Sequence, residues 1–407
     1  MVKQGNKILF IFFLIWAIVC STPILGKSLY FAALLVVSIV FIALNSNSFR
    51  FHRAMYWSVF LYIALIFVYK LIGYSSAEWG NYMHQLSFFI PLLLMFLIPD
   101  MLSNRQKTLL WWLVIAVMLF NIADNIYLSI LYPSLNSVSR FYQDEEFLAS
   151  INAGGSAFYT FSLLFFNVCF FVFLNCKKKK IKFAALAAAV ICAIYILGFC
   201  LKASVVVYFL LSLFLQYFAY RTSNTFLFFF VIGFTAILGI AVITVFQDSI
   251  VDFIISVSPD ERLTARLVTL IDAENAEADI STATNRTSLY LLSVETWLSD
   301  ISNFLFGIGD HRAAFGAKAT GIGQHSDLLD SLARYGLLGL VILVTIFKSF
   351  FKYLLTLFGK QYKPQLVTIF VILIMCGLTK GIFLPGVGCV MFLLLPLSKD
   401  IIIKSKE

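Results

Sequence analysis

The fold of this chain is decided by residues 183–220, which read FAALAAAVICAIYILGFCLKASVVVYFLLSLFLQYFAY and contain one charged residue, Lys202. An α-helix needs about 20 apolar residues to cross the hydrocarbon core of a membrane, which is roughly 30 Å thick. The stretch is long enough for two such helices, separated by a tight turn at Lys202. Because a backbone in lipid must satisfy its own hydrogen bonds, we predict two adjacent transmembrane helices here.

Windows of similar length and composition recur along the whole chain. Hydrophobic residues make up 61% of the 407 positions and charged residues 13%, whereas soluble domains have about 45–50% apolar and about 25% charged residues. These values exclude a soluble fold and predict an all-α, polytopic integral membrane protein, with residues 1–407 forming a single membrane domain. We expect about twelve transmembrane helices, at residues 8–23, 28–44, 54–73, 84–101, 108–131, 154–175, 183–201, 204–219, 225–246, 327–347, 365–384 and 386–398.

The distribution of Lys and Arg gives the orientation of these helices. Positive charge is retained on the cytoplasmic side of a membrane, and most of the 30 Lys and Arg residues lie near the chain ends or in alternate short connections such as residues 177–182. Both termini are therefore predicted to be cytoplasmic. The same segments account for the net charge of +9. Because they form no basic stripe interleaved with aromatic residues, we expect no nucleic-acid partner.

One outer connection, residues 247–326, is much longer than the others. Long loops in compact folds are usually functional or disordered, and this one contains an apolar stretch at residues 289–298 that is too short to cross a membrane. Such a stretch suits a short helix that lies in the membrane interface. We therefore predict a large outer loop that carries short interfacial helices and the active-site segment.

The most informative motifs stand at the end of that loop. Residues 307–312 read GIGDHR and residues 321–327 read GIGQHSD, directly before the tenth predicted helix. Glycine permits tight turns and a close approach of the backbone to a ligand. His325 comes just before the helix start, where free N–H groups favour a neutral imidazole that can accept a proton, as a general base must. The alternative is that Ser326 and Asp327 simply cap the helix and that His325 is a solvated loop residue.

Three cations lie close to the predicted outer surface. Arg286 precedes the 289–298 stretch, Lys202 is at the turn between the seventh and eighth helices, and Lys380 is near the outer end of the eleventh. A cation near hydrocarbon costs about 2.5–3.5 kcal/mol on insertion scales, so such residues usually face a cavity, a partner or a ligand. Together the three would suit a pyrophosphate held without metal. The alternative for each is that its side chain extends to the lipid headgroups.

Other residues suggest structural roles. Asp330 and Arg334 are four positions apart and are expected to pair on one helical face. The seven cysteines lie in or beside apolar runs without metal-type spacing, and no HExxH or Walker motif is present. We therefore expect no metal site and no cofactor.

Several of these residues resemble the signature of a known family. Arg286 ahead of a short helix that runs to residues 306–309 is similar to the large periplasmic loop of the O-antigen polymerase and O-antigen ligase superfamily, which are bacterial inner-membrane glycosyltransferases. The similarity continues with His325 and with residues 336–339, which enter a helix. Arg312 also stands at a spacing from a later glycine that is similar to one in polymerase outer loops. The similarity in topology covers most of the chain.

The resemblance implies an activity and a role for each residue. Arg286 and the basic residue at the turn, here Lys202, would engage the undecaprenyl pyrophosphate of a lipid-linked glycan, and His325 would activate the acceptor hydroxyl. The family usually has Ser-Arg at the turn, so Lys202 keeps the charge but not the bidentate geometry. The implied function is polymerisation of undecaprenyl-pyrophosphate-linked repeat units in the inner membrane, with room for a chain-length regulator protein as a partner.

Two other functions stay open at this point. A ligase of the same superfamily would transfer finished polymer to lipid A core, and ligases often have His-Asn where this chain has GQHSD at residues 323–327. A flippase or other transporter would be a different class, typically with inverted repeats and polar or broken helices near the midplane. Here unpaired charge gathers at the outer face, which favours an enzyme.

Overall fold

The computed structural model describes residues 53–71, 102–131, 157–199, 203–222, 280–309, 326–379 and 381–403, together with single helical positions between 10 and 18, between 86 and 95, and at 228 and 230. The regular structure in these ranges is helical, and they contain no strand. The prediction of an all-α protein is therefore confirmed for the described part of the chain.

The described helices follow one another in a fixed order along the chain. They are α4 (Arg53–Leu71), α7 (Asn104–Leu131), α9 (Ala157–Asn175), α10 (Lys179–Ile194), η3 (Tyr195–Phe199), α11 (Ala203–Arg221), α15 (Ile280–Leu298), α16 (Ile301–Phe306), α17 (Asp327–Phe358), η4 (Lys360–Tyr362), α18 (Lys363–Thr379), α19 (Pro385–Cys389), η5 (Val390–Leu394) and α20 (Leu395–Ile403). Counted with the π-helical turns η3 and η5, 6 helices among the described residues are long and apolar enough to cross a membrane. The protein is thus membrane-embedded, whereas the number twelve stays a prediction, because 28–44 and most of 225–246 lie outside the described residues.

Two helices run past their predicted boundaries. α17 continues to Phe358 instead of ending near residue 347, because Phe350, Leu354 and Phe358 are buried at four-residue spacing and extend its apolar stripe. α15 begins at Ile280, well before the expected short helix, since the preceding residues contain no glycine or proline that would stop it.

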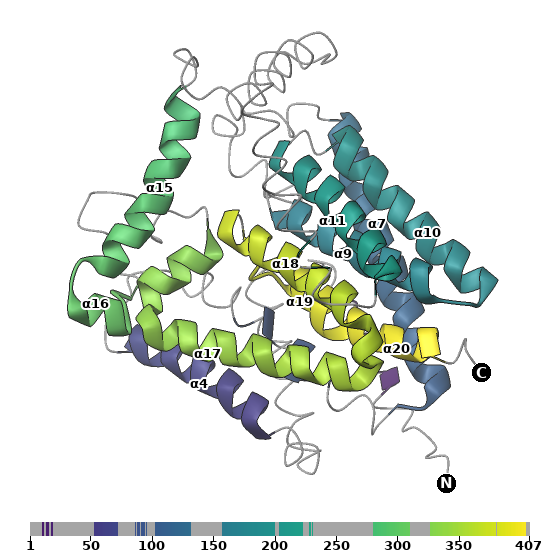
Figure 1. Ribbon diagram of the computed structural model, residues 1–407, viewed down its shortest axis with the longest axis horizontal. Coiled ribbons are helices and arrows are strands. Elements are labelled where there is room, and N and C mark those ends of the chain that lie inside the picture. The colour runs from purple at the N-terminus through teal and green to yellow at the C-terminus, as the bar shows by residue number, and fades with distance from the viewer. Residues whose placement is uncertain are drawn as a thin grey trace.

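Figure 1 shows how these helices are arranged. α7, α9, α10 and α11 form one group, and α4 lies along the long part of α17. α18 packs between α11 and α17, which places it in the interior of the bundle. α15 and α16 contact α17 near its beginning, and α20 lies near its other end (Figure 1). The two ends of α17 therefore belong to two different regions of the molecule.

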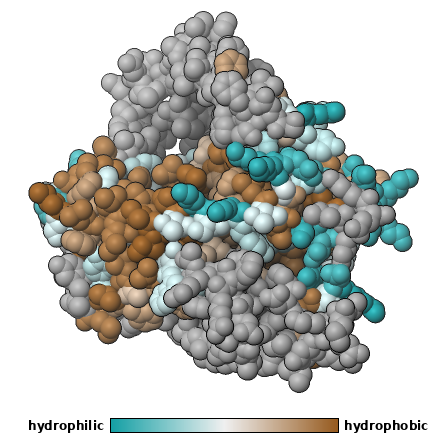
Figure 2. All heavy atoms as spheres, turned by 60° about the horizontal axis from the view of Figure 1, so that its bottom comes forward, coloured by the Kyte–Doolittle hydropathy of each residue, from teal (hydrophilic) through white to brown (hydrophobic). Residues whose placement is uncertain are grey.

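The packing follows the rules of a protein in lipid. α10 turns small residues toward α9, with Ala185, Ala188 and Ala189 buried, and small side chains allow close approach of helices when no hydrophobic effect drives them together. Large apolar side chains are exposed elsewhere, such as Leu61 on α4 at 55% and Val341 on α17 at 54%. Figure 2 shows a wide hydrophobic area on one side of the molecule and hydrophilic residues gathered toward the other. Such an apolar exterior suits contact with lipid.

A buried group of amides joins three of the helices. Asn175 of α9 donates to the Gln365 Oε1 atom of α18 at 3.1 Å, and Gln216 of α11 donates to the Gln365 backbone oxygen at 3.2 Å. Gln216 and Gln365 are buried. Hydrogen bonds between helices hold membrane bundles together, so this group fixes α18 against α9 and α11.

Candidate functional site

Helix α17 is interrupted at Gly336, where φ is 60° and ψ is −160°. This region of backbone space is essentially restricted to glycine. A Cβ atom at position 336 would lie 2.5 Å from the Gly307 nitrogen, and one at Gly307 would lie 2.2 Å from the Arg334 oxygen. The loop after α16 and the break in α17 therefore press backbone against backbone, and only glycine fits at either position.

The break frees two carbonyl groups, and the loop after α16 satisfies them. The Ile308 N–H donates to the Ala333 oxygen at 3.0 Å, and the Gly309 N–H donates to the Arg334 oxygen at 2.9 Å. An unsatisfied carbonyl next to lipid would cost several kcal/mol. We call residues 307–309 and 333–336 the glycine clip. The Tyr69 hydroxyl of α4 donates to the Phe306 oxygen at the edge of this clip.

A buried carboxylate joins α15 to α17. The Ser293 hydroxyl of α15 donates to the Asp330 Oδ1 atom at 2.6 Å, and both side chains are buried. Arg334, the residue predicted to pair with Asp330, contributes an electrostatic interaction with it, and the ion pair itself stays a prediction. The contact with Ser293 is the one that ties the two helices together, because a buried charged acceptor needs a donor.

The start of α17 is attached to the end of α18. Ser326 is the N-cap: its hydroxyl accepts from the Leu329 N–H at 3.1 Å and donates to the Gly377 oxygen at 3.1 Å. Asp327 does not cap its own helix. Its Oδ2 atom accepts from the Ile382 and Phe383 N–H groups at 2.6 and 2.8 Å. These bonds fix the turn that follows α18.

Two tyrosines bring two more helices to the same place. The Tyr208 hydroxyl of α11 donates to the Thr379 hydroxyl oxygen at 3.0 Å, and the Tyr290 hydroxyl of α15 donates to the Thr379 backbone oxygen at 3.4 Å. Thr379 is the last residue of α18. We call the meeting point of α11, α15, α17 and α18, formed by Tyr208, Tyr290, Ser326, Asp327 and Thr379, the junction.

The predicted substrate residues are placed only in part. Arg286 belongs to α15, but its side chain lies outside the described residues, as do His325, Lys202, Lys380 and Arg312 in full. The prediction that Arg286 precedes a short helix is wrong, because α15 begins earlier and includes it.

Sequence neighbours are described for three of these residues, but not for Arg312. Ser326 follows His325 in the sequence, and Thr379 precedes Lys380, and both neighbours belong to the junction. Ala203, which follows Lys202, begins α11, the helix that bears Tyr208. Arg286 is part of α15, the helix that bears Tyr290.

No group of three His, Cys, Asp or Glu side chains that could hold a metal ion occurs among the described residues. The described polar groups of the junction instead bind one another and the ends of neighbouring helices. The site is therefore a frame of four hydrogen-bonded helices, and His325 and Lys380 stand next to its residues in the sequence.

Searches against models of known protein families and against curated proteins found no match for this chain. The resemblance to the O-antigen polymerase and ligase superfamily therefore has no support from these comparisons.

Proposed function

We propose that this chain is a metal-independent glycosyltransferase of the bacterial inner membrane that polymerises oligosaccharide repeat units carried on undecaprenyl pyrophosphate. It would transfer the growing glycan from its lipid carrier to the next lipid-linked repeat unit. The chain would cross the membrane about twelve times, with both termini in the cytoplasm and residues 247–326 in the periplasm. The active site would then face the periplasm, at the junction.

The observation that carries the proposal is the meeting of four helices: the start of α17, the end of α18, the first turns of α11 and the middle of α15. α11, α15, α17 and α18 meet through hydrogen bonds at Thr379, Ser326 and Asp327. Each of these helices contains, or directly adjoins in sequence, one of the residues expected to act on a lipid pyrophosphate or on the acceptor. A shared frame of this kind is what a site assembled from distant parts of a sequence requires.

The reaction needs a base beside the acceptor and cations beside the leaving group. In the proposed step, an acceptor hydroxyl oxygen bonds to the anomeric carbon of the donor sugar while the bond from that carbon to the pyrophosphate oxygen breaks. His325 takes the hydroxyl proton. Undecaprenyl pyrophosphate leaves with the electron pair, and Arg286, Lys202 and Lys380, with Arg312 as a further candidate, stabilise the negative charge that develops on it.

The proposal is tested with purified protein in liposomes, lipid-linked repeat units and no added divalent metal. The wild type is expected to form chains of many units. Removal of a general base typically lowers the rate about 10²–10⁴-fold, so His325→Ala should lower it by this factor and leave donor binding intact. His311→Ala is the control and should keep most activity. Near wild-type turnover by His325→Ala would remove the base assignment, and wild-type protein that forms no polymer would refute the function.

Cells that lack the gene distinguish the polymerase from the ligase. A missing polymerase should leave single repeat units on the lipid carrier, because the units cannot be joined. A missing ligase should leave long polymer on the carrier, because only the transfer to lipid A core is lost. Accumulation of long polymer would therefore assign the ligase function instead.

One structural feature bears on the transporter alternative. Broken helices are common in transporters, where the break lies near the midplane of the membrane. In α17 the uncharged segment after Gly336 ends at Lys348, about 18 Å away at about 1.5 Å per residue. A membrane-spanning α17 would therefore carry the break inside the hydrocarbon core, which is about 30 Å thick. The break alone does not separate a transporter from an enzyme, so the polymerisation assay is accompanied by a transport assay in the same liposomes.

A further inference from the structure

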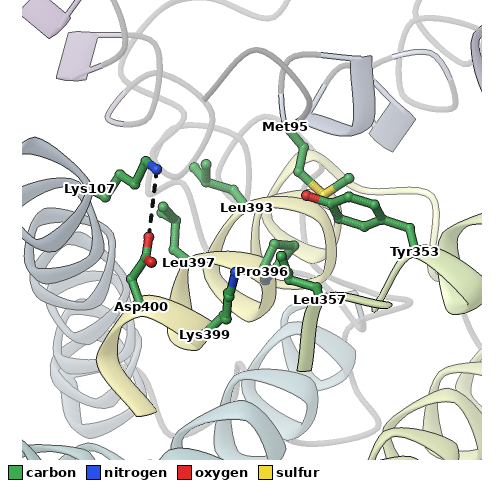
Figure 3. A pocket seen from close by; sticks show the side chains of 9 residues that line it. All are labelled: Met95, Lys107, Tyr353, Leu357, Leu393, Pro396, Leu397, Lys399 and Asp400. Atoms are coloured by element: carbon green, nitrogen blue, oxygen red, sulfur yellow. Dashed lines mark ion pairs between the residues drawn. The ribbon is translucent and has the colours of Figure 1, made fainter. Parts of the chain in front are cut away.

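A small hollow lies between helices near the C-terminal end of α17, with a volume of about 60 Å³. Its walls are mostly apolar, with Leu357 from α17 and Leu397 from α20 among the lining side chains. Three charged side chains complete it: Lys107 from α7, and Lys399 and Asp400 from α20. Figure 3 shows Lys107 and Asp400 on one side of the hollow, Met95 and Tyr353 on the other, and Lys399 drawn between them.

The hollow and the glycine clip lie far apart along α17. The distance from Gly336 to Leu357 is about 31 Å at about 1.5 Å per residue. Lysines gather at the end of α17 that holds the hollow, with Lys348, Lys352 and Lys360 close together in the sequence. The hollow therefore lies at the basic surface, away from the junction.

The charges of the hollow do not balance. The Lys107 Nζ and Asp400 Oδ2 atoms are 3.9 Å apart, and the side chains are 13% and 22% exposed. Lys399 adds a second ammonium group. Among the described residues that line the hollow, two ammonium groups and one carboxylate give one net positive charge beside apolar walls. A cation close to hydrocarbon is costly unless it meets an anion, so the hollow suits an anion that is attached to apolar chains.

We propose that this hollow binds the phosphate of an anionic phospholipid, with the phosphate near Lys107 and Lys399 and the acyl chains along the neighbouring helices. Basic pockets between transmembrane helices on the cytoplasmic side bind anionic lipid headgroups in other membrane proteins. The site is independent of the proposed glycosyl transfer and lies away from the junction, near the C-terminal end of α17.

The test measures how much phosphatidylglycerol the purified protein retains, by native mass spectrometry from mixed micelles that contain equal phosphatidylglycerol and phosphatidylcholine. Lys399→Gln removes one charge and leaves the pair between Lys107 and Asp400 intact. A basic residue near a lipid surface contributes enough for about a fivefold change in affinity, so retention should fall about fivefold. Lys360→Gln is the matched control, because Lys360 is exposed at the same end of the bundle and does not line the hollow. Equal retention by the two variants would overturn the proposal.

A second variant has an effect of opposite sign. Asp400→Asn removes the carboxylate and makes the hollow more positive, so retention of phosphatidylglycerol should rise although an ion pair is lost. If the pair with Lys107 only stabilises the fold, this variant would melt at a lower temperature with unchanged lipid retention, which would contradict the proposal.

Inorganic phosphate at the same phosphate concentration distinguishes a lipid site from a site for free phosphate. We expect it to leave phosphatidylglycerol retention unchanged, because it has no apolar chains to bury. Equal competition by inorganic phosphate would assign the hollow to a soluble anion and would overturn the lipid site.

Discussion

Gly336→Ala is the most direct test of the backbone contact in the glycine clip. At φ 60° and ψ −160°, a residue with a side chain costs about 1–3 kcal/mol in backbone strain. The new Cβ atom would also lie 2.5 Å from the Gly307 nitrogen. That neighbour is backbone and cannot rotate away, and overpacking of this kind typically costs about 1–3 kcal/mol. The free energy of unfolding is therefore expected to fall by about 2–6 kcal/mol.

Substitutions at two other glycines separate the cost of backbone strain from the cost of the steric clash. Gly359 has φ 100° and ψ 157°, and a Cβ atom there would meet nothing within 4 Å. Gly359→Ala should therefore lose only the strain, about 1–3 kcal/mol. Gly198 is helical and also has nothing within 4 Å of an added Cβ atom, so Gly198→Ala should be neutral or stabilising by up to about 1 kcal/mol.

Equilibrium unfolding of the four proteins in the same detergent, followed by far-ultraviolet circular dichroism, measures these differences. The expected order of stability is Gly198→Ala, wild type, Gly359→Ala and Gly336→Ala. The difference between the last two variants isolates the contact between the loop after α16 and the break in α17. If Gly336→Ala were as stable as Gly359→Ala, that contact would contribute nothing to stability, and the reasoning about the clip would fail.

Three further predictions concern the contact between α15 and α17, the topology and the leaving group. Ser293→Ala removes the donor 2.6 Å from a buried carboxylate and should lower the free energy of unfolding by about 1–3 kcal/mol in the same assay. Ser331→Ala, which removes a buried hydroxyl without a hydrogen-bond partner, should cost clearly less, and equal losses would contradict the role of the carboxylate. A reporter active only in the periplasm should give signal when fused at residue 275 and none at Lys179, whereas the reverse pattern would contradict the orientation. Arg286→Lys should recover little of the polymerisation lost in Arg286→Ala, because a point charge cannot make a bidentate contact; full activity of the Lys variant would show that charge alone suffices.

The helices themselves could be predicted from the sequence, because lipid leaves the backbone few alternatives. The spans predicted at residues 108–131 and 183–201 correspond to described helices of spanning length at residues 104–131 and 179–199. The start of α17 was also predictable, since Ser326 and Asp327 precede its apolar run and Ser326 is the N-cap. Positions and types of helices thus follow from local composition.

The break in α17 could not be predicted in the same way. Residues 327–347 are predicted as one continuous helix, and Gly336 looks like a residue at its entrance. The break depends on residues 307–309, which supply the N–H groups that replace the lost helical bonds. Their glycines suggest close approach to a ligand, whereas at Gly307 the close approach is to the backbone of α17. A sequence motif signals close approach but does not reveal the partner.

The hydrogen-bond partner of Asp330 also could not be predicted from the sequence. Spacing predicts Arg334 as its partner, because residues four apart on a helix are neighbours. The short hydrogen bond comes from Ser293, on a helix that is distant in sequence. No local pattern distinguishes this serine from the others in α15.

The described polar groups of the site bind one another and hold the helices together. Ser326 is hydrogen-bonded to the end of α18, and Asp327 is hydrogen-bonded to the turn after it. Ser293 is hydrogen-bonded to Asp330. Groups engaged in this way are poorly placed to bind substrate, because releasing them would leave buried polar atoms unsatisfied. If the proposed function is correct, the chemistry therefore falls to residues outside these hydrogen bonds, such as Arg286 and His325. Substitutions of the frame residues should lower stability and activity together. Substitutions of Arg286 or His325 should lower activity at unchanged stability. A Ser293 variant that keeps its stability but loses turnover would place that serine in the reaction instead.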